Sequence, residues 1–321
     1  MLNTLRPMSA FPDNDLLVEI ESHAAGLARE AGKILSSHFG GPLAVDYKDE
    51  GKQDPVTEAD RRSQDFLVEG IRARFPDHAV LGEEDDEDAD DETRLPDFVW
   101  ALDPLDGTKN FVGGLPVYAC SVGVLYRGVP VVGAIHVPWP GGAGEVMRAQ
   151  SGGGAFLEGE PVSVRESDGT GGKDLVALPS SFAGRYRLGP SAKRGLGEPR
   201  VTGSIAHELA MTAKGVFEYA IIGGSHLWDV AAGMVLVKEA GGVVMLGRRP
   251  TGLGSVLSTG TSWEPLGTVV EDWTSTTIKD LRRWSAPLLL GSPAAVRFLA
   301  ENLRTRRRLR RRFVRALGRL R

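Results

Sequence analysis

The chain has 321 residues, 41% of them hydrophobic, which suits a globular protein with a substantial core and room for about two lobes. A formal net charge of −4 disfavours nucleic acid as the main partner. A single cysteine excludes a disulfide framework, and the lack of any long apolar run excludes a typical membrane span.

Two helices are predicted near the start of the chain. Apolar residues recur every three or four positions between 17 and 34 and give the first helix one apolar face. The Gly-Gly-Pro sequence at 40–42 ends it. Thr57 is the expected N-cap of the second helix, with Glu58 and Asp60 in its first turn. The apolar positions of this second helix include Phe66, Leu67 and Ile71.

A short apolar run, 99–102, predicts a buried strand that leads directly into Asp103 and Asp106. Ligands of open α/β sheets collect where such strands end, and Gly107 with Thr108 is expected to form a turn there. Two carboxylates this close together repel each other in a shielded site unless a cation or a shared proton relieves the repulsion. Oxygen ligands favour Mg²⁺, Mn²⁺ or Ca²⁺. The alternative, that both acids are plain turn residues, explains the preceding strand less well.

The remainder of the chain predicts mixed α and β structure. Residues 118–126 and 129–137 are expected to be strands joined at Arg127 and Gly128, followed by a hairpin around 151–164. Cys120 lies in the first of these strands and is expected to be a packing residue. A Gly- and Ser-rich stretch at 166–172 is the expected hinge between two lobes. The predicted organisation is an N-terminal lobe at 1–166, a C-terminal lobe at 173–292 and a tail at 293–321.

Three further acidic positions have both a local and a functional interpretation. Glu83 follows a short apolar run, whereas the acidic stretch from Asp85 to Glu92 is typical of a solvated loop. Asp229 starts an apolar helical stretch, where an acid also complements the helix dipole. Asp60 is open to the same alternative, because its position in a first turn is explained by the dipole alone.

The order of these motifs resembles one known family. DPVTEAD (54–60), the acid pair of VLGEED (80–85), DPLDGT (103–108) and WD (228–229) follow one another as in the inositol monophosphatase family of metal-dependent phosphomonoesterases. The resemblance extends from Asp15 to Met245. It implies an αβαβα layered sandwich within the α/β class, whereas the residues alone support only mixed α and β structure.

The resemblance also implies a set of metal ligands. One Mg²⁺ would be held by Glu83, Asp103 and the Leu105 carbonyl. A second would be held by Asp103, Asp106 and Asp229. Thr108 would position the attacking water together with Glu83, and Asp60 would orient water or bind a third ion; Mn²⁺ suits the same oxygen atoms. Two metals suit the reaction because phosphate monoesters need accelerations up to ~10²¹-fold, whereas one acid or base contributes ~10²–10⁴.

The substrate is a small phosphorylated metabolite in this interpretation. The backbone N–H groups of Gly107 and Thr108 would donate to phosphate, and Gly203 with Ser204 would line the leaving-group pocket. Where inositol-processing members have a glutamate that contacts the sugar hydroxyls, this chain has Ile222, seven positions before Asp229. An inositol-phosphate-like monoester is the first expectation. Histidinol phosphate, a 3′(2′),5′-bisphosphate nucleotide and fructose 1,6-bisphosphate stay open.

The C-terminus has a different character. Arginines crowd residues 304–321, and apolar residues keep a helical spacing at Leu303, Leu309, Phe313, Leu317 and Leu320. This pattern predicts a basic amphipathic helix, which would be a solvated or partner-docking tail or would contact an anionic membrane or RNA. A non-catalytic, metal-stabilised interaction protein acting through this tail is the alternative of a different class, and the complete set of acids argues against it. The resemblance suggests a homodimer, and the lack of a secretory signal suggests a cytoplasmic location.

Overall fold

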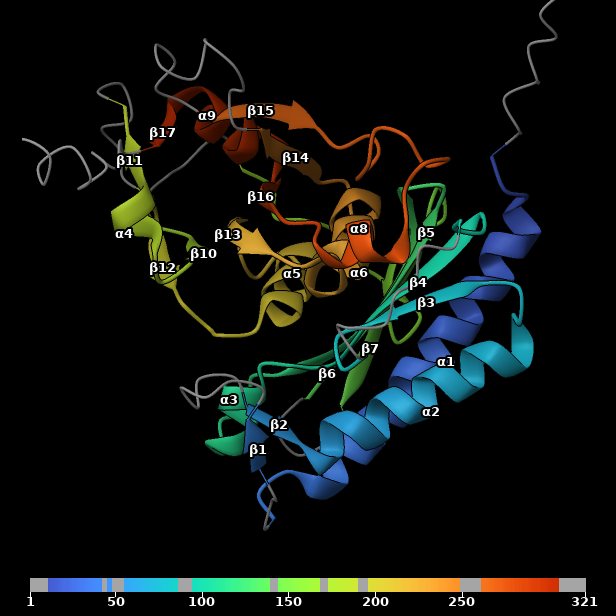
Figure 1. The fold of residues 1–321 in the computed structure, drawn as a ribbon. Coiled ribbons are helices and arrows are strands. Elements are labelled where there is room, and N and C mark those ends of the chain that lie inside the picture. The colour runs from blue at the N-terminus through green and yellow to red at the C-terminus, as the bar shows by residue number, and fades with distance from the viewer. Residues whose placement is uncertain are drawn as a thin grey trace, which may run out of the picture.

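The structure is a computed structural model that describes residues 11–41, 45–47, 55–85, 94–138, 144–167, 173–189, 196–248 and 261–305. Within these ranges helices and sheets alternate in layers, in the order helix, sheet, helix, sheet, helix (Figure 1). The αβαβα arrangement implied by the resemblance is therefore confirmed. No helix in the described ranges has the length and apolar character needed to cross a membrane.

The first layer consists of two helices that pack against each other and against the first sheet. Helix α1 (Asn14–His38) buries the predicted apolar face, and helix α2 (Glu58–Arg74) buries Leu67 and Ile71. Thr57 is the N-cap of α2 and forms a capping box with Asp60, as the sequence predicted for the cap. A short antiparallel ribbon of β1 (Val45–Tyr47) and β2 (Pro55–Thr57) precedes α2.

The first sheet has seven strands in the order β3-β4-β5-β6-β7-β8-β9. Their bounds are Ala79–Gly82, Phe98–Asp106, Ala119–Tyr126, Val129–Val137, Glu145–Gln150, Gly154–Leu157 and Glu160–Pro161. Only β3 and β4 are parallel, and every other pair is antiparallel. The predicted strand at 99–102 was too short, because β4 continues through Asp106 with a register shift between Asp103 and Asp106. The short helix α3 (Thr108–Val112) follows.

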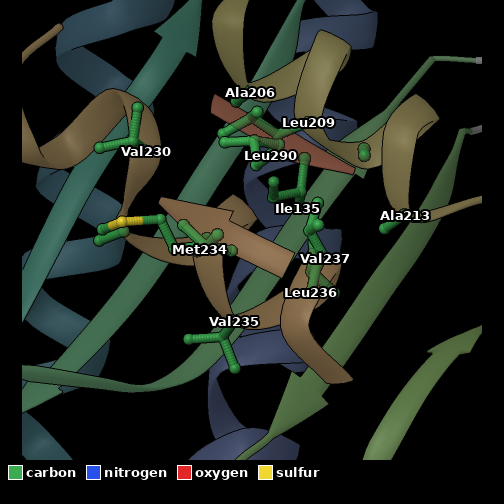
Figure 2. Packing of buried hydrophobic residues seen from close by; sticks show 14 of the residues in the cluster. Ile135, Ala206, Leu209, Ala213, Val230, Met234, Val235, Leu236, Val237 and Leu290 are labelled. Atoms are coloured by element: carbon green, nitrogen blue, oxygen red, sulfur yellow. The ribbon is translucent and has the colours of Figure 1, made fainter. Parts of the chain in front are cut away.

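The middle layer contains α5 (Ile205–Ala213) and α6 (Leu227–Glu239), and the second sheet lies beyond it. This sheet has the strand order β12-β10-β13-β16-β14-β15. In chain order the strands are β10 (Leu175–Ala177), β12 (Glu198–Arg200), β13 (Tyr219–Ser225), β14 (Val243–Arg248), β15 (Ser262–Pro265) and β16 (Ala286–Gly291). Side chains of α5, α6, β6 and β16 meet in the largest apolar cluster (Figure 2). The core that joins both halves is therefore centred on α6.

Two glycines let α6 lie directly on the first sheet. Gly123 of β5 and Gly133 of β6 are register partners. A Cβ on Gly133 would lie 2.3 Å from the Ala232 carbonyl oxygen, and one on Gly123 would lie 2.7 Å from the Ala232 nitrogen. Only the absence of side chains at these positions allows the helix backbone to approach so closely. This contact fixes the height of α6 above the sheet.

The outer layer lies on the far face of the second sheet, where α9 (Pro293–Asn302) packs in a third apolar cluster. Here α4 (Phe182–Arg185) leads into β11 (Tyr186–Leu188), which pairs antiparallel with β17 (Leu303–Thr305). Residues 293–305, which we assigned to the tail, thus form a helix and a strand, and Leu303 begins that strand rather than a basic helix. Positions 306–321 of the predicted tail and 168–172 of the predicted hinge lie outside the described residues.

Candidate active site

Strand pairing places Glu83 beside Asp103. Strand β3 runs parallel to β4 with Gly82 opposite Leu102, and the Glu83 N–H donates to the Leu102 carbonyl at 3.0 Å. The residues that follow, Glu83 and Asp103, are therefore neighbours at the same edge of this parallel pair. This parallel pair occurs in a sheet that is otherwise antiparallel.

The irregular end of β4 presents the acids of DPLDG. The Leu105 N–H donates to Asp103 Oδ1 at 3.0 Å, and this local bond accompanies the shift in register before Asp106. Gly107 then adopts a φ of 92° as the N-cap of α3. A side chain at that position would be strained and would contact Ser204 Cβ at 3.0 Å. The glycine thus permits both the turn and the close approach of the 202–204 segment.

Asp106 is held by the N-terminus of α5. Its Oδ2 accepts hydrogen bonds from the Ser204 hydroxyl at 2.7 Å and from the Ala206 N–H. Ser204 is also the N-cap of α5. A carboxylate at this position is stabilised by the free N–H groups and the dipole of the helix. The predicted substrate residue Ser204 is therefore in direct contact with a predicted metal ligand.

Asp229 lies in the first turn of α6, and its carboxylate interacts both with the helix start and with other acids. Its Oδ2 accepts the His226 N–H at 2.8 Å and closes a capping box. Its carboxylate also lies near enough to Asp106 and Glu83 for their charges to raise its pKa, in addition to the larger effect of burial. The helix start thus brings Asp229 close to Asp106 and Glu83. His226 itself is exposed and stacks on Trp228, with ring centroids 4.6 Å apart.

Asp60 contacts Thr108. The Thr108 hydroxyl lies 3.2 Å from Asp60 Oδ1 and 3.0 Å from the Leu105 carbonyl oxygen, to either of which it can donate. Asp60 Oδ2 accepts the Thr57 N–H at 2.8 Å. Burial raises the pKa of Asp60, and the charge of Glu83 adds to that increase. Asp60 therefore does more than cap α2, because it also contacts Thr108 and lies near Glu83.

The acidic cluster, defined here as Glu83, Asp103, Asp106 and Asp229, contains four carboxyl groups whose charges act on one another. Burial raises the pKa of Asp103 well above its usual value, and the charges of the other members of the cluster raise it further. Burial also raises the pKa of Asp106, to about 6, although Ser204 and the α5 backbone oppose that shift. Carboxyls in such surroundings ionise at a high energetic cost unless a cation approaches them.

The chemistry of these donors fits a hard divalent cation. All are oxygen atoms of carboxyl groups that repel one another; Asp103 and Asp106 are buried, whereas Glu83 and Asp229 are partly exposed. As the side chains stand, no group of at least three His, Cys, Asp or Glu residues within the described ranges is gathered as a metal site. A bound divalent ion would relieve the repulsion between these carboxylates.

Sequence reasoning missed two residues that support the predicted pocket. Asn110 of α3 donates to the Thr202 carbonyl at 2.8 Å, and a Cβ on Gly203 would lie 3.2 Å from the Asn110 side chain. Glu208 of α5 accepts the Thr202 N–H at 3.1 Å and its hydroxyl at 2.9 Å. The buried side chain of Glu208 has no local signal in the sequence, since a glutamate in a helix is usually exposed.

Glu208 leads to a prediction on pH and stability. Burial raises its pKa from 4.5 to about 7. A carboxyl whose pKa is raised by folding favours the folded state at low pH, and this contribution is lost as the pH rises from about 4.5 through about 7. We expect Glu208→Gln, which stays neutral, to remove on the order of 1–3 kcal/mol of this pH dependence. Urea unfolding of both proteins between about pH 5 and about pH 8 tests it, and parallel profiles would contradict it.

The solvated-loop prediction was wrong for Asp85. Its Oδ2 accepts the Gly82 N–H at 2.7 Å, and its Oδ1 accepts from Gln64 Nε2 at 3.0 Å. Residues 86–92 of the same acidic stretch lie outside the described residues. Ile222, which the resemblance aligned with a hydroxyl-binding glutamate, is buried in the largest apolar cluster.

Comparisons with known proteins all lead to one family of phosphatases. The model of the inositol monophosphatase family matches residues 16–272. The fructose-1,6-bisphosphatase/inositol-1-monophosphatase of Aquifex aeolicus is 31% identical over 239 residues, which are 72% of this chain and 87% of that protein. The histidinol-phosphatase of Chlorobaculum parvum is 31% identical over 237 residues, 72% of this chain and 84% of that one.

A solved structure of an IMPase from Thermotoga maritima superimposes with a TM-score of 0.64 at 27% identity, covering 88% of this chain and 97% of that chain. A match that extends over most of the sequence, on a chain with the same layered fold, shows that this protein belongs to the inositol monophosphatase family and is a phosphoric monoester hydrolase.

Proposed function

We propose that this protein hydrolyses a small phosphate monoester, most simply an inositol-phosphate-like one, with Mg²⁺ as its cofactor. The observation that carries the proposal is the acidic cluster, where burial and mutual repulsion raise the pKa of Asp103 and Asp229. A protein keeps such an arrangement at a cost in stability, and the cost is offset when a divalent cation binds. Mn²⁺ is the natural substitute.

The proposed ligands follow the acidic cluster. Glu83, Asp103 and the Leu105 carbonyl would hold one ion. Asp103, Asp106 and Asp229 would hold the other. Bound ions would supply a water of lowered pKa and stabilise charge on the phosphate and leaving oxygens. Asp103 belongs to both sets, which accords with its position beside Glu83 at the shift in register.

The protein's own groups would position water and phosphate. The Thr108 hydroxyl, 3.2 Å from Asp60 Oδ1, would donate to Asp60 and accept from the attacking water, with Glu83 as the second acceptor for that water. This pairing gives Asp60 its proposed catalytic role. The N–H groups of Gly107 and Thr108 are at the start of α3 and would donate to phosphate oxygens, while Gly203 and Ser204 would face the leaving group.

The leaving group is the open part of the proposal. Buried Ile222 offers no carboxylate to a ring of hydroxyls. Relatives of similar identity are named fructose-1,6-bisphosphatase/inositol-1-monophosphatase and histidinol-phosphatase. Fructose 1,6-bisphosphate, histidinol phosphate and 3′(2′),5′-bisphosphate nucleotides are therefore the alternatives to an inositol phosphate.

Phosphate release from a panel of these esters tests the proposal. The purified protein is assayed with inositol monophosphates and each alternative, with Mg²⁺, with Mn²⁺ and with excess chelator. We expect one preferred ester and a complete loss of release with chelator. Release that persists in chelator would contradict the role of the metal. Absence of release from every ester, with Mn²⁺ shown to bind, would contradict the proposed substrate class.

The assembly and tail predictions extend the proposal. A homodimer is expected, and light scattering of the purified chain measures it.

The Arg-rich tail is outside the described residues beyond Thr305. Weak contact with anionic lipid or RNA would appear as sedimentation with vesicles or RNA at low salt that is lost on removing 306–321. Absence of binding at low salt would contradict such contact. A cytoplasmic location remains the expectation.

A further inference from the structure

The side chain of Arg282 reaches from the C-terminal half to the segment that carries Glu83. Arg282 is the last residue of helix α8 (Ile278–Arg282), which is capped by Thr277 and anchored by buried Leu281. Its guanidinium donates to the Gly82 carbonyl at 3.1 Å and to Asp85 Oδ2 at 3.1 Å. The side chain is only 14% exposed. Gly82 and Asp85 flank Glu83, so the guanidinium holds both sides of that residue.

The same arginine contacts the segment that carries Asp229. Its guanidinium carbon lies 5.7 Å from the centre of the Trp228 ring, the residue before Asp229. Its carbonyl oxygen lies 3.4 Å from His226 Nδ1. His226 stacks on Trp228, and its own N–H donates to Asp229 at 2.8 Å. Arg282 therefore touches Trp228 and His226, which lie one and three residues before Asp229 at the start of α6.

A glutamine on α2 completes the attachment of the Glu83 segment. Gln64 Nε2 donates to Asp85 Oδ1 at 3.0 Å, and Gln64 Oε1 accepts the Glu84 N–H at 2.9 Å. Asp85 is thus engaged from two sides, by α2 of the first layer and by α8. A glycine is needed opposite Gln64, because a Cβ on Gly82 would lie 2.5 Å from Gln64 Oε1.

We propose that Arg282 is a positioning residue that holds Glu83 and Asp229 at the separation required for metal binding. Glu83 follows a strand of the first sheet, and Asp229 begins a helix that packs between the sheets, so no local structure sets their distance. Arg282 contacts both segments. The positive charge of Arg282 does not attract a cation. The inference rests on the proposed function only for the catalytic role of the bound metal. Metal binding itself does not depend on that function.

A positioning role and simple electrostatics predict opposite changes in the metal affinity of the Arg282→Met variant. Arg282→Met removes a positive charge from between the segments that carry Glu83 and Asp229, and electrostatics alone then predicts tighter binding of a divalent cation. Positioning predicts weaker binding, because groups that orient metal ligands typically change affinity by about 10–100-fold. A merely structural role would lower the thermal unfolding temperature and leave the affinity of the folded protein unchanged.

The test is Mn²⁺ affinity of the full chain, measured by electron paramagnetic resonance and by calorimetry. We expect Arg282→Met to bind Mn²⁺ at least about tenfold more weakly. Arg282→Lys, which keeps the charge and loses the planar fork, should fall between Arg282→Met and the wild type. Arg283→Met, the same change at the exposed neighbour, should match the wild type. Equal or tighter binding by Arg282→Met would overturn the inference.

A second variant covers the case in which Arg282→Met does not fold. Asp85→Asn keeps the volume and removes the partner of the guanidinium, and Asp65→Asn makes the same charge change on the exposed face of α2. Because loss of a nearby negative charge alone weakens cation binding, Mn²⁺ binding at least about tenfold weaker by Asp85→Asn than by Asp65→Asn supports the inference, and a smaller difference overturns it. A wild type that binds Mn²⁺ but hydrolyses no ester would refute only the proposed function. A wild type that binds no Mn²⁺ would refute both.

Discussion

Asp103→Asn is expected to reduce phosphate release by roughly 10³-fold or more. The substitution removes the charge of the residue placed in both proposed ligand sets, and metal contacts contribute several kcal/mol to phosphate transition states, at 1.36 kcal/mol for each tenfold change. The fold should remain, because an asparagine oxygen can still accept the Leu105 N–H as Asp103 Oδ1 does. Turnover of the preferred ester and a thermal melt of the metal-free protein measure the two effects.

The unfolding temperature of the metal-free Asp103→Asn protein also has a predicted direction of change. Burial raises the pKa of Asp103, so its ionisation at neutral pH opposes folding of the metal-free chain. Asp103→Asn should therefore unfold at the same or a higher temperature than the wild type without metal. Asp65→Asn, an exposed substitution on α2, should leave both turnover and stability unchanged. Wild-type turnover in Asp103→Asn would refute the metal assignment.

Gly133→Ala should destabilise the protein by about 3 kcal/mol, at the upper end of the range for overpacking. The added Cβ would lie 2.3 Å from the Ala232 carbonyl oxygen and 2.8 Å from its Cα, and backbone atoms cannot rotate away. Helix α6 would have to lift from the sheet. Because Asp229 is in the first turn of α6, Mn²⁺ affinity should fall as well. Urea unfolding and Mn²⁺ titration measure the two results.

Gly26→Ala provides the matched control. Gly26 is an exposed position inside α1, and a Cβ there has no heavy atom within 4 Å. The same substitution should stabilise the protein by roughly 0.5–1 kcal/mol through helix propensity. Destabilisation by Gly26→Ala, or a neutral Gly133→Ala, would show that the α6 contact is looser than these distances indicate.

Local structure was accessible from the sequence because its causes lie within a few residues. The spacing of apolar residues predicted α1, and Thr57 was identified as a cap from its neighbours. The hairpin between β5 and β6 turns at Arg127 and Gly128, both with positive φ, as the dipeptide suggested. The acids of the proposed site were named in advance by their motifs, and the resemblance supplied the layers that periodicity could not.

Local patterns in the chain are enough to identify the oxygen donors and the elements that carry them. Their contacts with one another depend on how those elements pack. Asp106 contacts Ser204, 98 residues away, and Asp85 contacts Arg282, 197 residues away. Such contacts follow from sheet register and from the close packing of α6, which no local pattern encodes. The prediction of a solvated loop was therefore wrong at Asp85. An acidic side chain in a charged stretch is expected to be solvated, but here folding brings the Arg282 guanidinium to its carboxylate.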